Sequence, residues 1–425
     1  MNADRPDFDD FAEPAALIAQ LGRRARAAAR ELARATTAQK STALREAAVA
    51  LRRAEPAILS ANARDMAAAA RLSPAMRDRL LLDPARLAGI ADAVDAVAAL
   101  PDPVGQVIDA TQRPNGLRLA RVRVPIGVIG IIYESRPNVT ADAAALCVMA
   151  GNAAILRGGS EAVTTNRAIH AAFAEGLAAA DLPVDAVQLV PTQDRTVVGA
   201  MLAAADVLDL VVPRGGKGLV ARVQADARVP VLAHLDGINH VYVDASADPA
   251  MAAAVVRDAK LRRTGVCGAM ECLLVDRAYP DAADLARGLA NAGCEVRAGS
   301  ALLALAPELP AAGDEDWGTE YLDAIAAADL VDGVAGAIAH IARHGSHHTD
   351  AIIAEDAAAA ERFLAEVDSA IVLWNASTQF ADGGEFGLGA EIGIATGRLH
   401  ARGPVALEGL TTYKWIGRGS GQVRG

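Results

Sequence analysis

The sequence predicts an α/β fold, and three observations support this prediction. Residues 13–99 show the apolar spacing of amphipathic helices. The run Ile126–Ile132 is apolar on both faces, as is typical of a buried parallel strand. Short apolar strands then alternate with alanine-rich helical stretches, an order that builds parallel sheets covered by helices. A chain of 425 residues, at about 150 residues per domain, predicts two or three domains.

The N-terminal helical region divides at two proline positions. Ser73-Pro74 and Asp83-Pro84 are interpreted as breaks with helix starts after them, because proline is tolerated in the first turn of a helix. The first dozen residues are expected to be loose. Leucines at helical intervals mark the apolar face: Leu17, Leu21, Leu32, Leu44 and Leu51.

The expected strands follow residue 103. Leu117–Val124 alternates apolar and basic residues, which predicts a strand with one solvated or partner-facing side. Further strands are expected after Ile126–Ile132, separated in many places by alanine-rich helices. These are Ala153–Arg157, Val187–Val190, Leu208–Val212, Val241–Val243, Glu271–Val275, Ala351–Ile353 and Ala370–Trp374.

Composition excludes several classes of protein. The longest apolar runs, near Val124–Tyr133 and Ala143–Leu156, are shorter than the ~20 residues of a membrane-spanning helix. A net charge of -11 argues against a general nucleic-acid binder. The N-terminus is acidic and has no apolar signal segment, so we expect a cytoplasmic protein. Four irregularly spaced cysteines are too few for a disulfide framework.

Two glycine-containing turns are candidates for binding the phosphates of a nucleotide. The Gly-x-Gly-x-x-Gly pattern of ordinary Rossmann proteins is not found after an early strand. Instead, Arg214, Gly215, Gly216 and Lys217 connect an expected strand to an expected helix, where free N–H groups can bind an anion. An ordinary tight turn is the alternative interpretation of this segment.

The second turn lies after the strand Ala153–Arg157. Arg157, Gly158, Gly159 and Ser160 could hold a ribose or its 2′-phosphate, whereas the alternative makes Ser160 the N-cap of a following helix.

Cys267 is the candidate nucleophile among the four cysteines. It lies in a glycine-flanked loop, and Arg262 and Arg263 nearby would favour its thiolate. Core or structural roles are expected for Cys147, Cys272 and Cys294. The histidines of residues 344–348 have no evident partners for a metal site, so no metal is expected, although His348 could line a pocket.

A set of motifs distributed over nearly the whole chain resembles the gamma-glutamyl phosphate reductase branch of the aldehyde dehydrogenase superfamily. The most specific are the segments Tyr133-Glu134-Ser135-Arg136-Pro137-Asn138 and His400-Ala401-Arg402-Gly403-Pro404. The others are residues 125–130, 151–152, 157–161, 213–218, 264–267, 387–393 and 410–417.

This resemblance implies an activity and roles for particular residues. The implied reaction is the NADPH-dependent reduction of L-glutamyl 5-phosphate to L-glutamate 5-semialdehyde and phosphate, the second step of proline synthesis from glutamate. Cys267 would be the nucleophile and Asn138 the oxyanion donor. NADPH would contact Arg157, Gly158, Ser160, Gly215, Gly216, Lys217 and Glu320. The candidates for binding the anionic substrate are Arg136, Arg263 and Arg402.

The resemblance also implies an aldehyde dehydrogenase-like fold of two parallel-sheet α/β domains and a small β oligomerisation element. Residues 1–116 and 125–238, with part of 376–400, would form the cofactor-binding domain, and residues 239–375 the catalytic domain. Residues 117–124 and 401–425 would form the third element, whose exposed strand favours a homo-oligomer. A transient contact with glutamate 5-kinase is a further hypothesis, motivated by the instability of an acyl phosphate.

One departure from the wider superfamily bears on the chemistry. Hydrolytic aldehyde dehydrogenases carry a glutamate base in a Glu-Leu-Gly-Gly segment, where this chain has His234-Leu235-Asp236-Gly237. Loss of the base that activates water fits a phosphate-linked reductase. Two alternatives stay open at this stage: an oxidative, NAD-dependent aldehyde dehydrogenase, and a catalytically silent binding protein that keeps the fold.

Overall fold

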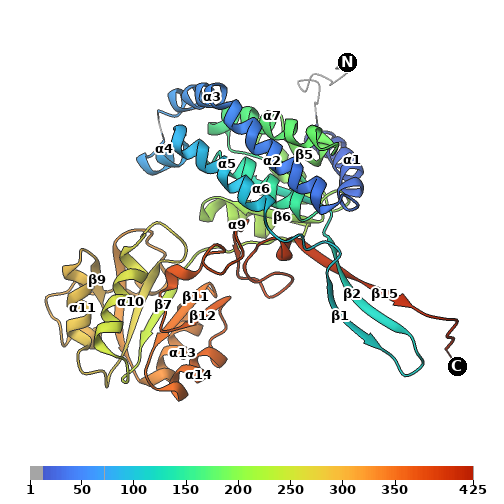
Figure 1. Cartoon of the computed structure of the whole chain (residues 1–425). Helices are drawn as coiled ribbons and strands as arrows, with labels where there is room; N and C mark the ends of the chain where they lie inside the picture. Colours follow the sequence, from blue (N-terminus) through green and yellow to red (C-terminus); the bar gives the residue numbers. More distant parts are fainter. Residues whose placement is uncertain (1–12, 71, 425) are drawn as a thin grey trace. The chain divides into compact units, whose positions relative to one another are not determined.

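The computed structural model describes residues 13–70 and 72–424, which fold into two compact units (Figure 1). The first unit contains the described residues up to Ala233, together with Leu388–Gly393 and the chain from Val405 onward. The second contains His234–Gly387 and Ile394–Pro404. The division expected after residue 238 therefore falls inside the second unit. Residues 1–12, expected to be loose, lie outside the described residues.

The N-terminal region of the first unit is helical, as the apolar spacing predicts. Its helices are α1 (Pro14–Leu32), α2 (Thr37–Arg53), α3 (Glu55–Ala68), α4 (Pro74–Leu80) and α5 (Pro84–Ala98). Ser73 and Asp83 cap α4 and α5 by accepting hydrogen bonds from the backbone N–H groups of Met76 and Arg86. The two proline positions thus start helices as expected.

A four-stranded parallel sheet of order β5-β4-β3-β6 forms the centre of this unit. Its strands are β3 (Val128–Tyr133), β4 (Ala153–Arg157), β5 (Val187–Leu189) and β6 (Leu210–Arg214). Buried residues of α1 and α8 pack with those of β3, β4 and β6 in one core cluster. The remaining helices of this part are α6 (Val139–Met149), α7 (Val163–Ala179), α8 (Thr196–Ala203) and α9 (Lys217–Asp226).

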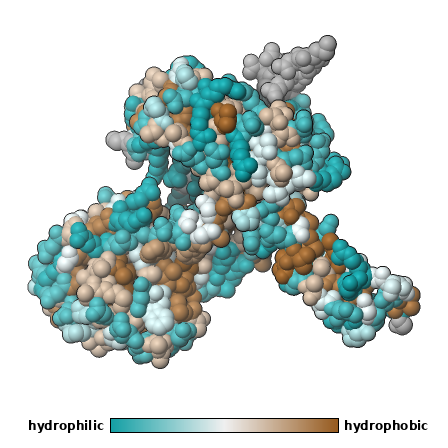
Figure 2. Space-filling model, viewed as in Figure 1, coloured by the Kyte–Doolittle hydropathy of each residue, from teal (hydrophilic) through white to brown (hydrophobic). Residues whose placement is uncertain are grey.

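A separate antiparallel sheet joins residues that are distant in sequence. β2 (Arg118–Pro125) pairs on one side with β1 (Val107–Gln112) and on the other with β15 (Thr411–Arg418). Every residue of β1 is exposed. Figure 2 shows hydrophobic surface on this sheet.

The second unit contains a six-stranded parallel sheet of order β12-β11-β7-β8-β10-β9. Alternate strand residues pack under α10 and α11 on one face and under α13 and α14 on the other. The strands are β7 (Asn239–Val243), β8 (Met270–Asp276), β9 (Glu295–Ala298), β10 (Ile325–Val331), β11 (Thr349–Ile353) and β12 (Ile371–Trp374). The helices are α10 (Pro249–Leu261), α11 (Ala282–Asn291), α12 (Ser300–Leu303), α13 (Gly333–His344) and α14 (Ala357–Glu366). A short antiparallel pair is formed by β13 (Ile394–Ala395) and β14 (Gly403–Pro404).

The predicted α/β class with parallel sheets is confirmed, and every expected strand is present within a few residues. The sequence pattern did not identify β1, β9 and β10. β10 has alanines at its centre, as the helices of this chain do, and β1 has no buried face to produce an alternating pattern. In the part of the chain that the structure describes, no helix is long and apolar enough to span a membrane.

Candidate active site

Cys267 lies in the loop between α10 and β8, and its backbone is held from two sides. The side-chain Nδ2 of Asn239 donates to the carbonyl oxygens of Cys267 at 2.6 Å and Ala269 at 2.7 Å. A Cβ atom on Gly237 would lie 2.1 Å from the Cys267 carbonyl oxygen, so only glycine fits there. The thiol is half-buried. The loop therefore presents a partly accessible sulfur from a fixed main chain.

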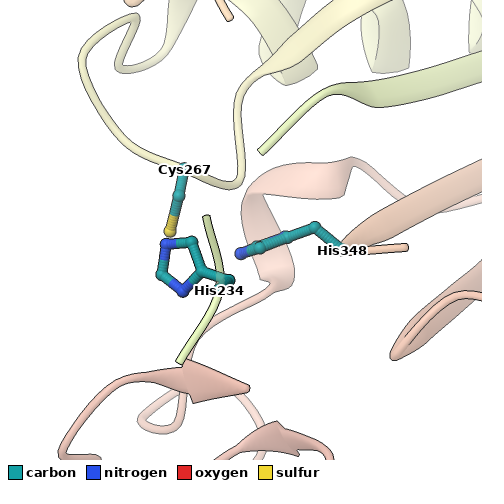
Figure 3. Close-up of side chains that lie close together, drawn as sticks. All are labelled: His234, Cys267 and His348. Atoms are coloured by element: carbon teal, nitrogen blue, oxygen red, sulfur yellow. The ribbon is translucent and has the colours of Figure 1, made fainter. Parts of the chain in front are cut away.

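Two histidines lie beside this sulfur (Figure 3). The Cys267 Sγ and one ring nitrogen each of His234 and His348 all lie within 4.8 Å of one another. The two rings meet edge to face, with centroids 4.9 Å apart. His234 begins the second unit, and His348 directly precedes β11. Their closeness to Cys267 was not predicted, although the sequence indicated that His348 could line a pocket.

The His234 ring is held by a hydrogen bond to β13. Its Nδ1 lies 2.8 Å from the carbonyl oxygen of Ile394 in β13. A carbonyl only accepts, so Nδ1 carries the proton, and in a neutral imidazole Nε2 is then the nitrogen that can accept one. Figure 3 shows the Cys267 sulfur next to the ring nitrogen on the side away from that contact. His234 is thus placed to take a proton from the thiol.

His348 is fully buried, whereas His234 is only half-buried. Its Nδ1 lies 2.9 Å from Thr349 Oγ1, and its Nε2 has no hydrogen-bond partner within the described residues. Burial, with a smaller contribution from His234, lowers the pKa of His348 to about 3. This ring is therefore neutral near pH 7 and contributes no charge beside the sulfur.

The other candidate binding residues in the second unit, Glu320, Arg263 and Arg402, differ in their hydrogen bonds, ion pairs and exposure. Glu320, the candidate ribose ligand, accepts a hydrogen bond from the Gly237 N–H through Oε1 at 2.9 Å, which places it next to the Cys267 loop. Arg263 is exposed, and its carbonyl accepts from Gln379 at 3.1 Å. Arg402 pairs with the carboxylate of Asp368 at 2.8 Å. Its guanidinium is therefore already engaged in an ion pair.

The candidates for nucleotide binding meet at one edge of the first sheet. In the strand register Ile132 lies opposite Arg157, and Tyr133 lies opposite Arg214, so the loops after β3, β4 and β6 adjoin. Ligands of open parallel sheets bind at this carboxyl edge. Arg157 is buried and donates to the carbonyls of Gly158 and Gln193.

The contacts of the loop residues explain why glycine or a charged residue occurs at these positions. Gly216 is the N-cap of α9, and its N–H donates to the Glu134 carboxylate at 3.0 Å, while Lys217 is exposed in the first turn. A Cβ on Gly215 would lie 2.5 Å from Glu134 Oε2, and one on Gly158 would lie 2.2 Å from Asn166 Nδ2. The N-terminus of α9 thus already attracts a carboxylate, as a helix dipole predicts.

Ser160 starts a short 3-10 helix, whose N-cap is Gly159 rather than Ser160.

Asn138 and Arg136 precede α6 in the first unit, whereas Cys267 belongs to the second. The Asn138 Nδ2 donates to Asp142 Oδ2 at 2.8 Å, and burial raises the pKa of Asp142 to about 6. Arg136 is half-buried. Within the second unit, the structure brings together Cys267, Glu320 and the two unexpected histidines.

Comparison with known proteins identifies relatives over nearly the full length. The sequence profile described as the aldehyde dehydrogenase family matches residues 12–304. The chain is 68% identical over 410 residues to a gamma-glutamyl phosphate reductase of Novosphingobium aromaticivorans, covering 96% of each chain. It is 62% identical to one of Zymomonas mobilis, covering 98% of each. The crystal structure of gamma-glutamyl phosphate reductase from Thermotoga maritima matches with a TM-score of 0.93 at 42% identity, covering 96% of this chain and 100% of that one.

We predict that a thiol reagent labels Cys267 selectively, because the other three cysteines are buried. Burial raises the pKa of Cys147 to about 12, that of Cys294 to about 11 and that of Cys272 well above its ordinary value. At neutral pH these thiols stay protonated and covered, so they should not react with iodoacetamide. Peptide mass spectrometry of the native protein should find the label on Cys267.

Cys267→Ala is the control and should remove the label without exposing another thiol. Labelling of a buried cysteine at a comparable rate in the folded wild type would contradict this interpretation.

Proposed function

The chain belongs to the aldehyde dehydrogenase family, among the gamma-glutamyl phosphate reductases, and we propose that it reduces L-glutamyl 5-phosphate to L-glutamate 5-semialdehyde. The reaction uses NADPH, releases phosphate and is the second step of proline synthesis from glutamate. The observation that carries the mechanism is the pairing of Cys267 with His234, at the position where hydrolytic relatives have a glutamate base.

The first half of the reaction forms a thioester. His234 accepts the thiol proton at Nε2, and the thiolate attacks the acyl carbon of the substrate. The bond from that carbon to the phosphate oxygen then breaks, and inorganic phosphate leaves with the bonding electron pair. The backbone N–H of Cys267 and the side-chain amide of Asn138 are the proposed donors to the oxyanion. Only one of the two Asn138 amide hydrogens is needed for Asp142.

The second half converts the thioester to the aldehyde. When bound, NADPH would provide the hydride that reduces the thioester carbon. Collapse of the resulting tetrahedral adduct breaks the carbon–sulfur bond and returns the Cys267 thiolate, which can regain its proton from His234. With a pKa of about 3, His348 is too weak a base to activate water against the thioester. His234 still holds the proton that it took from the thiol, so it cannot act as that base either, and reduction is favoured over hydrolysis.

The residues at the carboxyl edge of the first sheet fit a phosphorylated nucleotide. Arg157 keeps a buried Nε atom for which the described part of the chain offers no hydrogen-bond acceptor. Arg214 and Lys217 flank the N-terminus of α9, and Gly216 and Gly218 have open space where a side chain would lie. Arg157, Gly158, Ser160, Gly215, Gly216 and Lys217 would hold the phosphates and ribose, and Glu320 a ribose hydroxyl.

The substrate carries a carboxylate and a phosphate, both of which require cations or N–H donors. Arg136, Arg263 and Arg402 remain the proposed contacts. Among them Arg263 is exposed in the Cys267 loop, whereas Arg402 would have to share its guanidinium with Asp368. Arg263 is therefore the best supported of the three. We also propose a cytoplasmic location and a transient contact with glutamate 5-kinase, the latter because an acyl phosphate is unstable.

We also propose that the chain assembles into a homo-oligomer through the sheet of β1, β2 and β15. Val107, Ile108, Tyr413 and Trp415 are exposed on this sheet, and the Arg121 guanidinium lies 5.2 Å from the Tyr413 ring centroid. Exposed aromatic and arginine side chains are enriched at protein interfaces. A narrow sheet gains stability when a second copy covers its exposed residues.

The reaction predicts strict phosphate dependence in the reverse direction. With glutamate semialdehyde, NADP should be reduced only when inorganic phosphate is present, because phosphate must cleave the thioester. Absorbance of NADPH measures the rate. Cys267→Ala should lower that rate by at least about 10³-fold. Equal rates with and without phosphate would instead identify a hydrolytic dehydrogenase.

The role of His234 predicts a pH-dependent defect. His234→Gln cannot accept the thiol proton, so kcat/KM should fall by about 10²-fold at pH 7. The loss should shrink as pH rises toward the ordinary thiol pKa of about 8.5, because the thiolate then forms without a base. The rate of Cys267 alkylation should show the same pH shift.

His170→Gln, on α7 of the first unit, is the control and should leave both profiles unchanged. A pH-independent loss of activity in His234→Gln, with unchanged alkylation, would show a structural role only.

The proposed assembly predicts that Trp415→Lys lowers the oligomeric mass measured by sedimentation at fixed protein concentration. Val49→Lys is a matched control, since Val49 on α2 is 52% exposed and Trp415 is 59% exposed. A monomeric wild type, or an unchanged mass for Trp415→Lys, would refute assembly through this sheet.

A further inference from the structure

A second thiol–imidazole cluster lies inside the second unit, away from Cys267. Asp350 on β11, His240 on β7 and Cys272 on β8 are direct register partners on three adjacent parallel strands. Their side chains therefore project from the same face of the sheet. Helix α13 covers that face, since Ala337 and Ile341 pack in one core cluster with Cys272.

Helix α13 adds two more imidazoles over this row. His340 and His344 are four residues apart and so lie on the same side of the helix, with ring centroids 4.7 Å apart. His340 Nε2 lies 3.8 Å from Cys272 Sγ. One ring nitrogen each of His240 and His340 and the Cys272 sulfur all lie within 4.8 Å of one another.

Asp350 fixes the orientation of His240. One carboxylate oxygen, Oδ1, accepts from both the backbone N–H and the ring Nδ1 of His240, each at 2.9 Å. The other, Oδ2, accepts from the Ser369 hydroxyl at 2.5 Å. With Nδ1 protonated in this way, His240 Nε2 is directed into the cluster. It is fully buried and has no hydrogen-bond partner among the residues that the structure describes.

We propose that His240, Cys272 and His340 bind a zinc ion, with His344 as the fourth ligand. Mixed sulfur and imidazole ligands in tetrahedral geometry are typical of structural zinc. Zinc bonds of the usual length predict a sulfur–nitrogen separation of about 3.6 Å, close to the separation of Cys272 and His340. A carboxylate that holds the second nitrogen of a histidine ligand is the usual outer contact of such sites.

The site would stabilise the second unit rather than take part in catalysis. Zinc binding requires the Cys272 thiolate, so the thiol proton is released to solvent. The ion would then join β7, β8 and α13. It would also provide a partner for His240 Nε2, which has none among the residues that the structure describes. This inference does not depend on the proposed reaction, because none of its ligands belongs to the Cys267 site.

The test uses the full-length Cys267→Ala protein, because His234, Cys267 and His348 form a competing set of donors. After removal of metal with a chelator, addition of Zn²⁺ and desalting, elemental analysis should find one zinc per chain. The double variants Cys267→Ala/Cys272→Ser and Cys267→Ala/His340→Ala should lose it. Cys267→Ala/Cys294→Ser removes a buried thiol of the same unit and should keep it.

Two further measurements separate loss of the metal from loss of the fold. Co²⁺ in place of zinc should give a thiolate charge-transfer band that is absent from Cys267→Ala/Cys272→Ser. Zn²⁺ should raise the thermal unfolding midpoint of Cys267→Ala but not that of Cys267→Ala/His340→Ala, whose replaced side chain is half-exposed. Circular dichroism confirms that each variant is folded.

Absence of zinc from Cys267→Ala after loading would overturn the proposal. Full zinc retention in either folded ligand variant would overturn it equally.

Discussion

The proposed active site depends on one buried side chain, Asn239 at the start of β7. Its amide nitrogen donates to the carbonyls of Cys267 and Ala269, and its amide oxygen accepts from the backbone N–H of Thr349. Asn239 therefore fixes the nucleophile loop to the residue that follows His348. Because a buried amide is costly unless all of its polar atoms are paired, these three hydrogen bonds reinforce a single arrangement. These bonds hold the backbone on which Cys267 and His348 lie, whereas His234 is held by its hydrogen bond to the Ile394 carbonyl.

Anion binding by this acidic chain depends on positive charges at particular sites, not on its net charge. The protein carries a net charge of -11, although the proposed substrate and cofactor are both anions. Binding then requires local groups of cations and N–H donors. Arg157, Arg214 and Lys217 at one sheet edge provide such a group, and the helix N-terminus beside them already holds the Glu134 carboxylate. A neutral His348 avoids adding charge next to the thiolate.

Much of the fold could be predicted from sequence, because apolar runs and the effect of proline at helix starts are local. The α/β class, the strand Ala153–Arg157 and the helix start after Ser73 follow from such patterns. β10 was missed because its central alanines match the composition of the helices. Cys267 was identified as the candidate nucleophile from its loop, whereas for His348 the sequence indicated only that it could line a pocket.

The rest of the candidate site depends on contacts between distant segments. His234 was recognised as a replacement for a glutamate, but its orientation depends on a carbonyl in β13, 160 residues away. His240, Cys272 and His340 become neighbours only through strand register and the covering helix. The sequence therefore gave no reason to expect a metal there.

In the proposed reaction, the Cys267 sulfur carries the acyl group between phosphate release and reduction. Mass spectrometry of the protein, quenched in acid after exposure to freshly generated L-glutamyl 5-phosphate without NADPH, tests this role. We expect a glutamyl adduct on the Cys267 peptide that hydroxylamine removes and that Cys267→Ala lacks. Turnover of the substrate with NADPH but no adduct on Cys267, or an adduct on another residue, would contradict it.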